Sequence, residues 1–122
     1  MRIKLDKADR VFSKYIRERD KWICQRCRTP FEPNSQGLHC SHYFGRGNEC
    51  TRFDPENCDA LCMGCHQAWD SNKEDYRDFK IKQLGEQEFQ ILRIRASSIC
   101  KKDRELSYLI AKKLLENVKK NI

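Results

Sequence analysis

The sequence predicts a small α+β domain in which a short β hairpin is flanked by helices. The chain has 122 residues, enough for one domain with one modest core. Apolar residues recur at helical spacing near both ends, whereas the middle is turn-rich and contains only short strand-like runs. Two CxxC pairs are typical of small domains that a metal ion stabilises. We therefore treat residues 1–122 as a single domain.

The N-terminal segment predicts a helix over residues 7–19. In KADRVFSKYIRER one face is apolar, and Asp6 precedes it as a helix cap. The following WICQRCRTPFEPNSQG is rich in Pro, Asn and Gly and predicts a metal knuckle and a loop. We expect a brief strand over residues 38–43, LHCSHY, and then a loop through FGRGNECTRFDPEN. The metal-stabilised core would thus span about residues 22–84.

The remaining chain predicts helices. Aromatic and apolar residues favour a helix from about Cys65 to Leu84, and Gly85 is a plausible stop. C-terminal helices follow over residues 86–120: a short one and a last one whose apolar positions recur at i, i+3 and i+4. No internal repeat or low-complexity segment is visible.

The composition of the chain limits the class of molecule that it is expected to bind. The chain is 35% charged with a net charge of +7 and a pI of about 9.1, which favours a phosphate-bearing partner, either a nucleic acid or an anionic membrane. No run approaches the roughly 18 apolar residues of a spanning helix, and MRIKLDKADR lacks the apolar core of a signal peptide. We expect a cytoplasmic protein without a membrane role, and in that reducing compartment we do not expect disulfides.

The CxxC pairs predict a structural zinc site. Cys24 and Cys27 form one pair, and Cys62 and Cys65 form the other. Four thiolates satisfy tetrahedral Zn²⁺ and leave no position for a substrate. The alternatives are buried free cysteines at this spacing and a redox pair. The other cysteines are either small buried residues or part of a second zinc site; they are Cys40, Cys50, Cys58 and Cys100.

All three histidines lie between His39 and His66. The order His42, then Asn57, then a CxxC followed by His66 is more specific than any of its parts. A neutral imidazole near pH 7 can take a proton from water, although a single histidine is more often structural. Asn57 could also simply cap the segment that follows it.

This pattern resembles the HNH nucleases, whose ββα-metal or His-Me finger fold encloses one divalent ion between two strands and a helix. FSKYIRERD, the first CxxC, HCSHY, the RG of the central loop and RFDPENC with the second CxxC resemble the NinG/Rap recombination endonucleases of lambdoid phages over roughly residues 7–80. The resemblance implies a phage or prophage protein in a bacterial host. It also implies a metal-dependent endodeoxyribonuclease that uses Mg²⁺ or Mn²⁺ on branched DNA such as Holliday junctions.

The resemblance assigns roles residue by residue. His42 matches the general base, Asn57 the residue that binds the metal or orients the base, and His66 the final histidine, a metal ligand or phosphate contact. Ser41 stands where many HNH enzymes have a metal-binding Asp or His. His39 could supply that ligand, but strand alternation puts it opposite His42 unless the strand bends. Asp70, one turn after His66, is an alternative carboxylate ligand.

Arg46 and Arg52 flank the central loop and are our candidates for DNA backbone contacts. Basic residues of the first and last helices would add sequence-independent attraction to double-stranded or branched DNA. A homodimer would suit a symmetric junction, with the apolar last helix as its contact surface. Two alternatives remain open: a site-specific HNH nicking endonuclease, and a zinc-ribbon DNA-binding module without catalysis.

Overall fold

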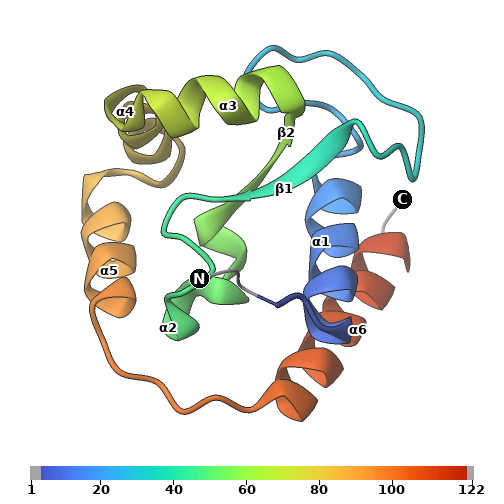
Figure 1. The fold of residues 1–122 in the computed structure, drawn as a ribbon, viewed down its shortest axis with the longest axis vertical. Coiled ribbons are helices and arrows are strands. Elements are labelled where there is room, and N and C mark those ends of the chain that lie inside the picture. Colours follow the sequence, from blue (N-terminus) through green and yellow to red (C-terminus); the bar gives the residue numbers. More distant parts are fainter. Residues whose placement is uncertain (1–3, 121–122) are drawn as a thin grey trace.

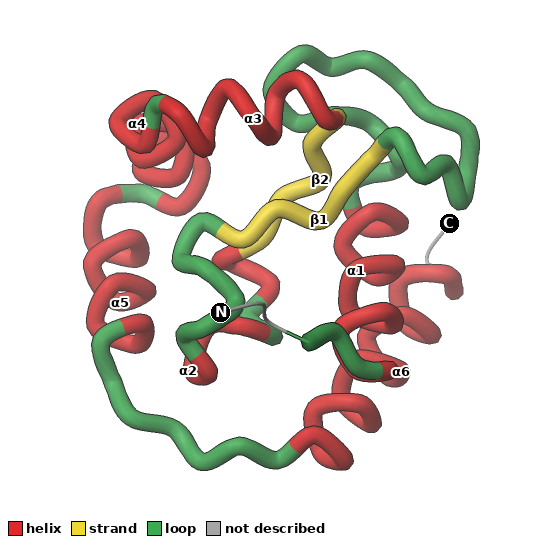
Figure 2. The backbone as a smooth tube through the Cα atoms, viewed as in Figure 1, coloured by secondary structure: helices red, strands yellow, loops and turns green. Residues whose placement is uncertain are grey.

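The computed structural model describes residues 4–120. A two-stranded antiparallel hairpin lies at the centre, and helices surround it (Figures 1 and 2). In chain order the elements are α1 (Lys7–Arg19), β1 (Leu38–His42), α2 (Glu49–Arg52), the 3-10 helix η1 (Pro55–Asn57), β2 (Cys58–Cys62), α3 (Met63–Ser71), α4 (Lys73–Leu84), α5 (Glu86–Ala96) and α6 (Arg104–Lys120). The α+β class with a short hairpin is therefore as predicted.

Helix α1 has the predicted bounds. The Asp6 side chain accepts hydrogen bonds from the backbone amides of Ala8 and Asp9, and the Asp9 carboxylate accepts one from the Asp6 amide. This reciprocal capping satisfies amides that a helix start leaves without partners. The buried face of α1 carries Phe12 and Ile16, and α6 lies alongside it (Figure 1).

The register of the hairpin decides which side chains share a face. Cys40 lies opposite Ala60, and His42 lies opposite Cys58. Because side chains two apart on a strand, and those directly opposite on its partner, point to the same side, Cys40, His42 and Cys58 share one face. Phe12 and Ile16 of α1 belong to the same buried cluster as the two cysteines.

The opposite face of the hairpin packs on α4. The Ser41 hydroxyl lies 3.0 Å from the Tyr76 hydroxyl, and Asp59 forms a buried ion pair with Lys80 at 3.1 Å. Tyr76 also belongs to the larger hydrophobic cluster, with Trp69 of α3 stacked on its ring at 4.5 Å. The hairpin is therefore covered on both faces.

Three local expectations need correction. The helix expected from about Cys65 to Leu84 is two helices, because the chain turns at Asn72, whose side chain caps α4 by accepting from the Asp75 amide at 3.2 Å. The expected central loop contains the short helices α2 and η1. The expectation of no disulfides is wrong for Cys50 and Cys100, which are bonded. Their Cα atoms lie 5.3 Å apart, within the range a disulfide spans, where the segment that follows α5 passes α2.

Within residues 4–120, no helix combines the length and the apolar character needed to cross a membrane.

Candidate metal centre and active site

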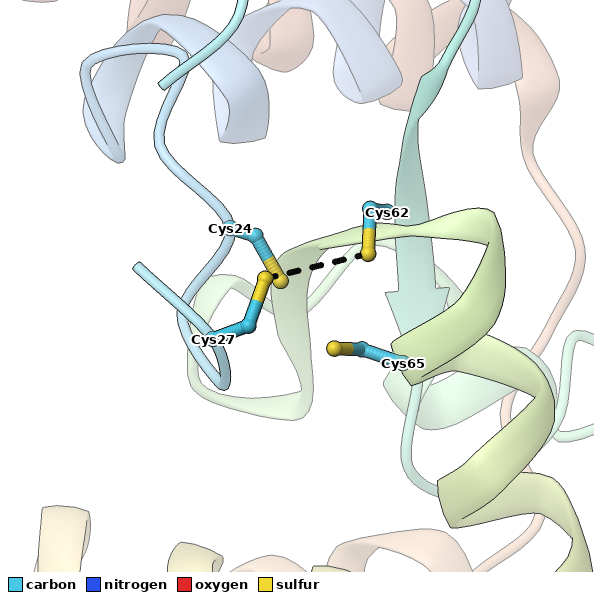
Figure 3. Close-up of side chains that lie close together, drawn as sticks. All are labelled: Cys24, Cys27, Cys62 and Cys65. Atoms are coloured by element: carbon cyan, nitrogen blue, oxygen red, sulfur yellow. Dashed lines mark hydrogen bonds between the residues drawn. The ribbon is translucent and has the colours of Figure 1, made fainter. Parts of the chain in front are cut away.

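The four predicted zinc ligands converge from two parts of the fold (Figure 3). Cys24 and Cys27 come from the turn after α1, while Cys62 ends β2 and Cys65 lies in the first turn of α3. Their sulfurs all lie within 4.8 Å of one another, and Cys27 Sγ is 3.9 Å from Cys62 Sγ. Two sulfurs bound to tetrahedral zinc at about 2.3 Å would be about 3.8 Å apart. The donor set fits, so these cysteines could hold a zinc ion.

The surroundings also suit a thiolate cluster. The backbone amide of Cys24 donates to the Thr29 carbonyl at 3.0 Å and closes the knuckle. Arg26 Nη1 donates to Cys65 Sγ at 3.4 Å, and its guanidinium lies over the Trp69 ring at 5.8 Å. A cation here offsets the excess negative charge of four thiolates around a divalent ion. Zinc bound here would join the N-terminal loop to the start of α3.

His42 lies at the end of β1 in a defined protonation state. Its Nε2 is 2.9 Å from the backbone carbonyl of Arg52. Because a carbonyl only accepts, Nε2 must donate and therefore carries a proton. Burial, and then the positive charge of Arg46, lower the pKa of His42 to about 4. At neutral pH the ring is thus uncharged and its lone pair is on Nδ1, which is buried and has no hydrogen-bond partner among residues 4–120.

Arg52 does not have the role we expected. The residue is 6% exposed, and its side chain forms a two-point ion pair with Asp9: Nε donates to Oδ1 at 2.9 Å and Nη2 to Oδ2 at 2.6 Å. Nη2 also donates to the Lys4 carbonyl at 3.1 Å. Burial raises the pKa of Asp9, but the hydrogen bonds from Arg52 and the Asp6 amide outweigh it and leave the pKa below its usual value. Instead of facing a phosphate, Arg52 anchors α2 to α1 and so holds the carbonyl that binds His42.

Asn57 also acts on His42 through the backbone. Its side chain is fully buried; Nδ2 donates to the carbonyls of Phe44 and Thr51 at 2.9 and 3.0 Å, and Oδ1 accepts from the Phe44 amide at 2.9 Å. These bonds tie the two ends of the loop that contains Arg46. The Asn57 amide is thus hydrogen-bonded to backbone groups of this loop.

An open cleft of about 360 Å³ lies beside His42. Its lining residues are Leu5, Cys40, His42, Gly45, Arg46 and His66. A neighbouring cavity of about 340 Å³ shares Cys40, Arg46 and His66 with it and is also lined by His39 and Arg17. Arg46, the other predicted phosphate contact, thus lies at the border of both cavities.

His39 of β1 and His66 of α3 lie next to each other. Their Nδ1 atoms are 3.4 Å apart and their rings are edge to face. His66 borders the cleft of His42, so it links the two cavities even though His39 and His42 belong to opposite strand faces. Burial lowers the pKa of His66 below its usual value.

Asp70 lies one helical turn beyond His66. Its Oδ2 is 3.7 Å from His66 Nε2, and its Oδ1 is 3.8 Å from Lys73 Nζ. Among residues 4–120, two sets of at least three Cys, His, Asp or Glu side chains lie within 4.8 Å of one another: the four zinc-site cysteines, and Cys40 with His42 and Cys58. His39, His66 and Asp70 do not form such a set in the part of the chain described.

Sequence reasoning missed two features of this region. The Asp9–Arg52 pair joins residues 43 positions apart and has no local signal. The grouping of Cys40, His42 and Cys58 had a partial signal, since Cys40 and His42 are two apart on a predicted strand. What the sequence lacked was the register that places Cys58 opposite His42.

Comparison with protein families gives a match that covers almost the whole chain. The model of the bacteriophage lambda NinG protein family matches residues 3–120. Comparisons with curated proteins and with solved structures found no significant match. Since the match spans far more than half of the chain, this protein belongs to the bacteriophage lambda NinG family.

Proposed function

We propose that this protein is a metal-dependent DNA endonuclease of the HNH class that acts in phage recombination, with His42 as the general base. The observation that carries the proposal is the state of the His42 ring. Its proton is committed to the Arg52 carbonyl, and its unprotonated Nδ1 has no partner among the described residues, in a side chain that lines an open cleft. A DNA-binding module has no need of such a group.

Phosphodiester hydrolysis requires a water molecule to lose a proton as it attacks phosphorus, and the leaving oxygen to be stabilised. In this proposal His42 Nδ1, which is buried in the structure, accepts the proton from a water that enters from the adjoining cleft. The Arg52 carbonyl stabilises the resulting imidazolium, because it accepts from Nε2 throughout. A pKa of about 4 makes His42 a weak base, so the attacking water must itself be acidified.

A bound Mg²⁺ or Mn²⁺ would supply that acidification and would stabilise charge on the phosphate. His39, His66 and Asp70 are the residues we propose to hold it or to contact the phosphate. His39 and His66 already lie together at the edge of the cleft, and Asp70 adds a hard oxygen ligand one turn away. Arg46, at the border of both cavities, would bind the scissile phosphate or its neighbour.

The charge and the exposed apolar surface of the protein support binding to DNA and the formation of a dimer. The net charge of +7 favours DNA, and the cavity beside the cleft is also lined by Arg17. Branched DNA is the substrate that the resemblance to recombination endonucleases favours. Helix α6 exposes Leu106, Leu109 and Ile110 at 50–58%, an apolar surface on which a homodimer for a symmetric junction could form.

The experiment compares cleavage of supercoiled plasmid and of a synthetic four-way junction in Mg²⁺ and in Mn²⁺. We expect wild-type protein to cut, and His42→Ala to keep its fold and the zinc of the four-cysteine site but lose cleavage. The matched control is Ser41→Ala, the neighbouring strand residue whose side chain faces α4 instead of the cleft. Binding without cleavage by the wild type would instead identify a DNA-binding module, and one nick at one plasmid site would identify a site-specific nickase.

A further inference from the structure

We propose that Cys40, His42 and Cys58 form a second metal site, which takes a soft divalent cation such as Zn²⁺ and switches off the base. The positions of the three side chains in the fold favour binding of the ion. The inhibitory half of the inference rests on the proposed function.

The hairpin brings the three side chains together. Cys40 and His42 are two residues apart on β1, and Cys58 of β2 is paired with His42 in the antiparallel register. All three therefore project to the same face. One ligand atom from each lies within 4.8 Å of the other two. Zinc bonds of about 2.3 Å to sulfur and about 2.0–2.1 Å to nitrogen then require small side-chain rotations and no change of fold.

The donor chemistry selects a soft ion. Two thiolates and an imidazole prefer Zn²⁺ or Cd²⁺, whereas Mg²⁺ and Mn²⁺ prefer oxygen ligands. Each thiol would release one proton on binding, so that a divalent ion and two thiolates form a neutral unit. A neutral unit suits a place where Cys40 is 4% exposed, Cys58 is fully buried and α1 supplies apolar neighbours.

His42 has a ligand atom free for this role. Nε2 donates to the Arg52 carbonyl, whereas Nδ1 is buried and lacks a hydrogen-bond partner within residues 4–120. A buried nitrogen without a partner is unfavourable, and a metal ion would satisfy it. The Arg52 carbonyl would then serve as the outer hydrogen-bond partner that metal-binding histidines normally have.

The site has access and one open position. Cys40 and His42 both line the 360 Å³ cleft, which would bring an ion to the edge of the buried site and supply the water that completes its coordination. This arrangement differs from the four-cysteine site, whose coordination shell the protein closes by itself.

Zinc bound at this second site would stop DNA cleavage by the proposed nuclease. The lone pair that accepts the proton of water and the lone pair that would bind zinc belong to the same imidazole. A chain with both soft sites filled would keep its fold and lose its base. Inhibition should then follow the second equivalent of zinc, while the first stabilises the fold.

The test measures zinc bound per chain by equilibrium dialysis and elemental analysis, in the presence of a reductant that does not bind metal. We expect wild-type protein to bind a second equivalent, and Cys40→Ala/Cys58→Ala to bind the first only. The matched control is Cys50→Ala/Cys100→Ala, which removes two cysteines outside both sites and should keep the second equivalent. Binding of only one equivalent by the wild type would overturn the inference, as would an unaltered second equivalent in the Cys40/Cys58 variant.

Single variants keep the test decisive should the double variant fold poorly. Cys40→Ala and His42→Ala each remove one direct ligand. We expect each to weaken the second equivalent by at least about 100-fold, since losing an outer partner alone costs 10–100-fold. Unchanged affinity in both variants would refute the assignment.

A cleavage assay at rising zinc separates this inference from the proposed function. We expect the second equivalent of zinc to inhibit DNA cleavage by wild-type protein and by the Cys50→Ala/Cys100→Ala control. The same zinc concentration should not inhibit cleavage by Cys40→Ala. Cleavage without a second equivalent would refute the metal site alone. A second equivalent in a protein that never cuts DNA would refute the nuclease and leave the metal site standing.

Discussion

Replacement of Arg52 by Met separates two roles for this residue. A surface arginine that contacts DNA can be replaced with little effect on stability. The structure instead places Arg52 at 6% exposure in a two-point ion pair with Asp9, which is 5% exposed. Removing one member of a buried pair leaves the other charge uncompensated and typically costs about 3–5 kcal/mol. A domain of this size is stable by about 5–15 kcal/mol, so Arg52→Met should lose a large part of its free energy of unfolding.

The assay is urea denaturation with zinc present, followed by the fluorescence of the two tryptophans, Trp22 and Trp69, both of which are buried. Arg46→Met is the matched control, because Arg46 lies in the loop that precedes α2 and borders the cleft. We expect the control to lose DNA affinity and to keep its unfolding free energy. Adding Asp9→Asn to Arg52→Met should recover part of the loss by removing the uncompensated charge. Equal unfolding free energies for Arg52→Met and Arg46→Met would refute the reasoning.

Three further predictions concern pH, zinc and the disulfide. The pKa of His42 in the folded protein is about 4, below the ordinary 6.5, so the contribution of His42 to stability is complete above pH 6.5. It is lost as the pH falls towards 4, which lowers the unfolding free energy by about 3 kcal/mol. The unfolding free energy measured across this range should therefore fall with pH more steeply in wild-type protein than in His42→Gln. Removing zinc with a chelator, or substituting Cys62→Ser, should abolish the cooperative melt seen by calorimetry, and an unchanged melt would contradict a structural role for the ion. Reducing the Cys50–Cys100 bond, which spans a sequence separation of 50, should lower the unfolding free energy by up to about 4 kcal/mol, and an unchanged denaturation midpoint would count against a stabilising bond.

Local patterns were enough to predict α1 and the zinc cysteines. The bounds of α1 follow from a helical apolar stripe and from Asp6 and Asp9, which are close in sequence. The CxxC spacing is likewise local, and it identified a set of sulfurs that does converge. The break at Asn72 also had a local signal, an Asn three residues before the Asp whose amide it caps, but the continuous apolar and aromatic pattern concealed it.

Features that depend on distant segments could not be predicted in the same way. Strand β2 is buried along most of its length and so lacks the alternation by which a half-exposed strand is recognised. The Arg52 carbonyl, which sets the protonation of His42, reaches it only because Asp9 and Asn57 hold α2 and its loop in place. From the sequence we therefore assigned Arg52 to DNA, because the partner that the structure gives it, Asp9, is distant in the sequence.

The most direct test of the account is the ratio of the single-turnover cleavage rates of wild-type protein and His42→Ala on one four-way junction in Mn²⁺, with one zinc ion per chain and equal DNA occupancy in both. A positioned general base contributes roughly 10²–10⁴-fold, so we expect the variant to be slower by at least about 100-fold while Ser41→Ala cuts at the wild-type rate. Equal rates for wild type and His42→Ala would contradict the role of His42.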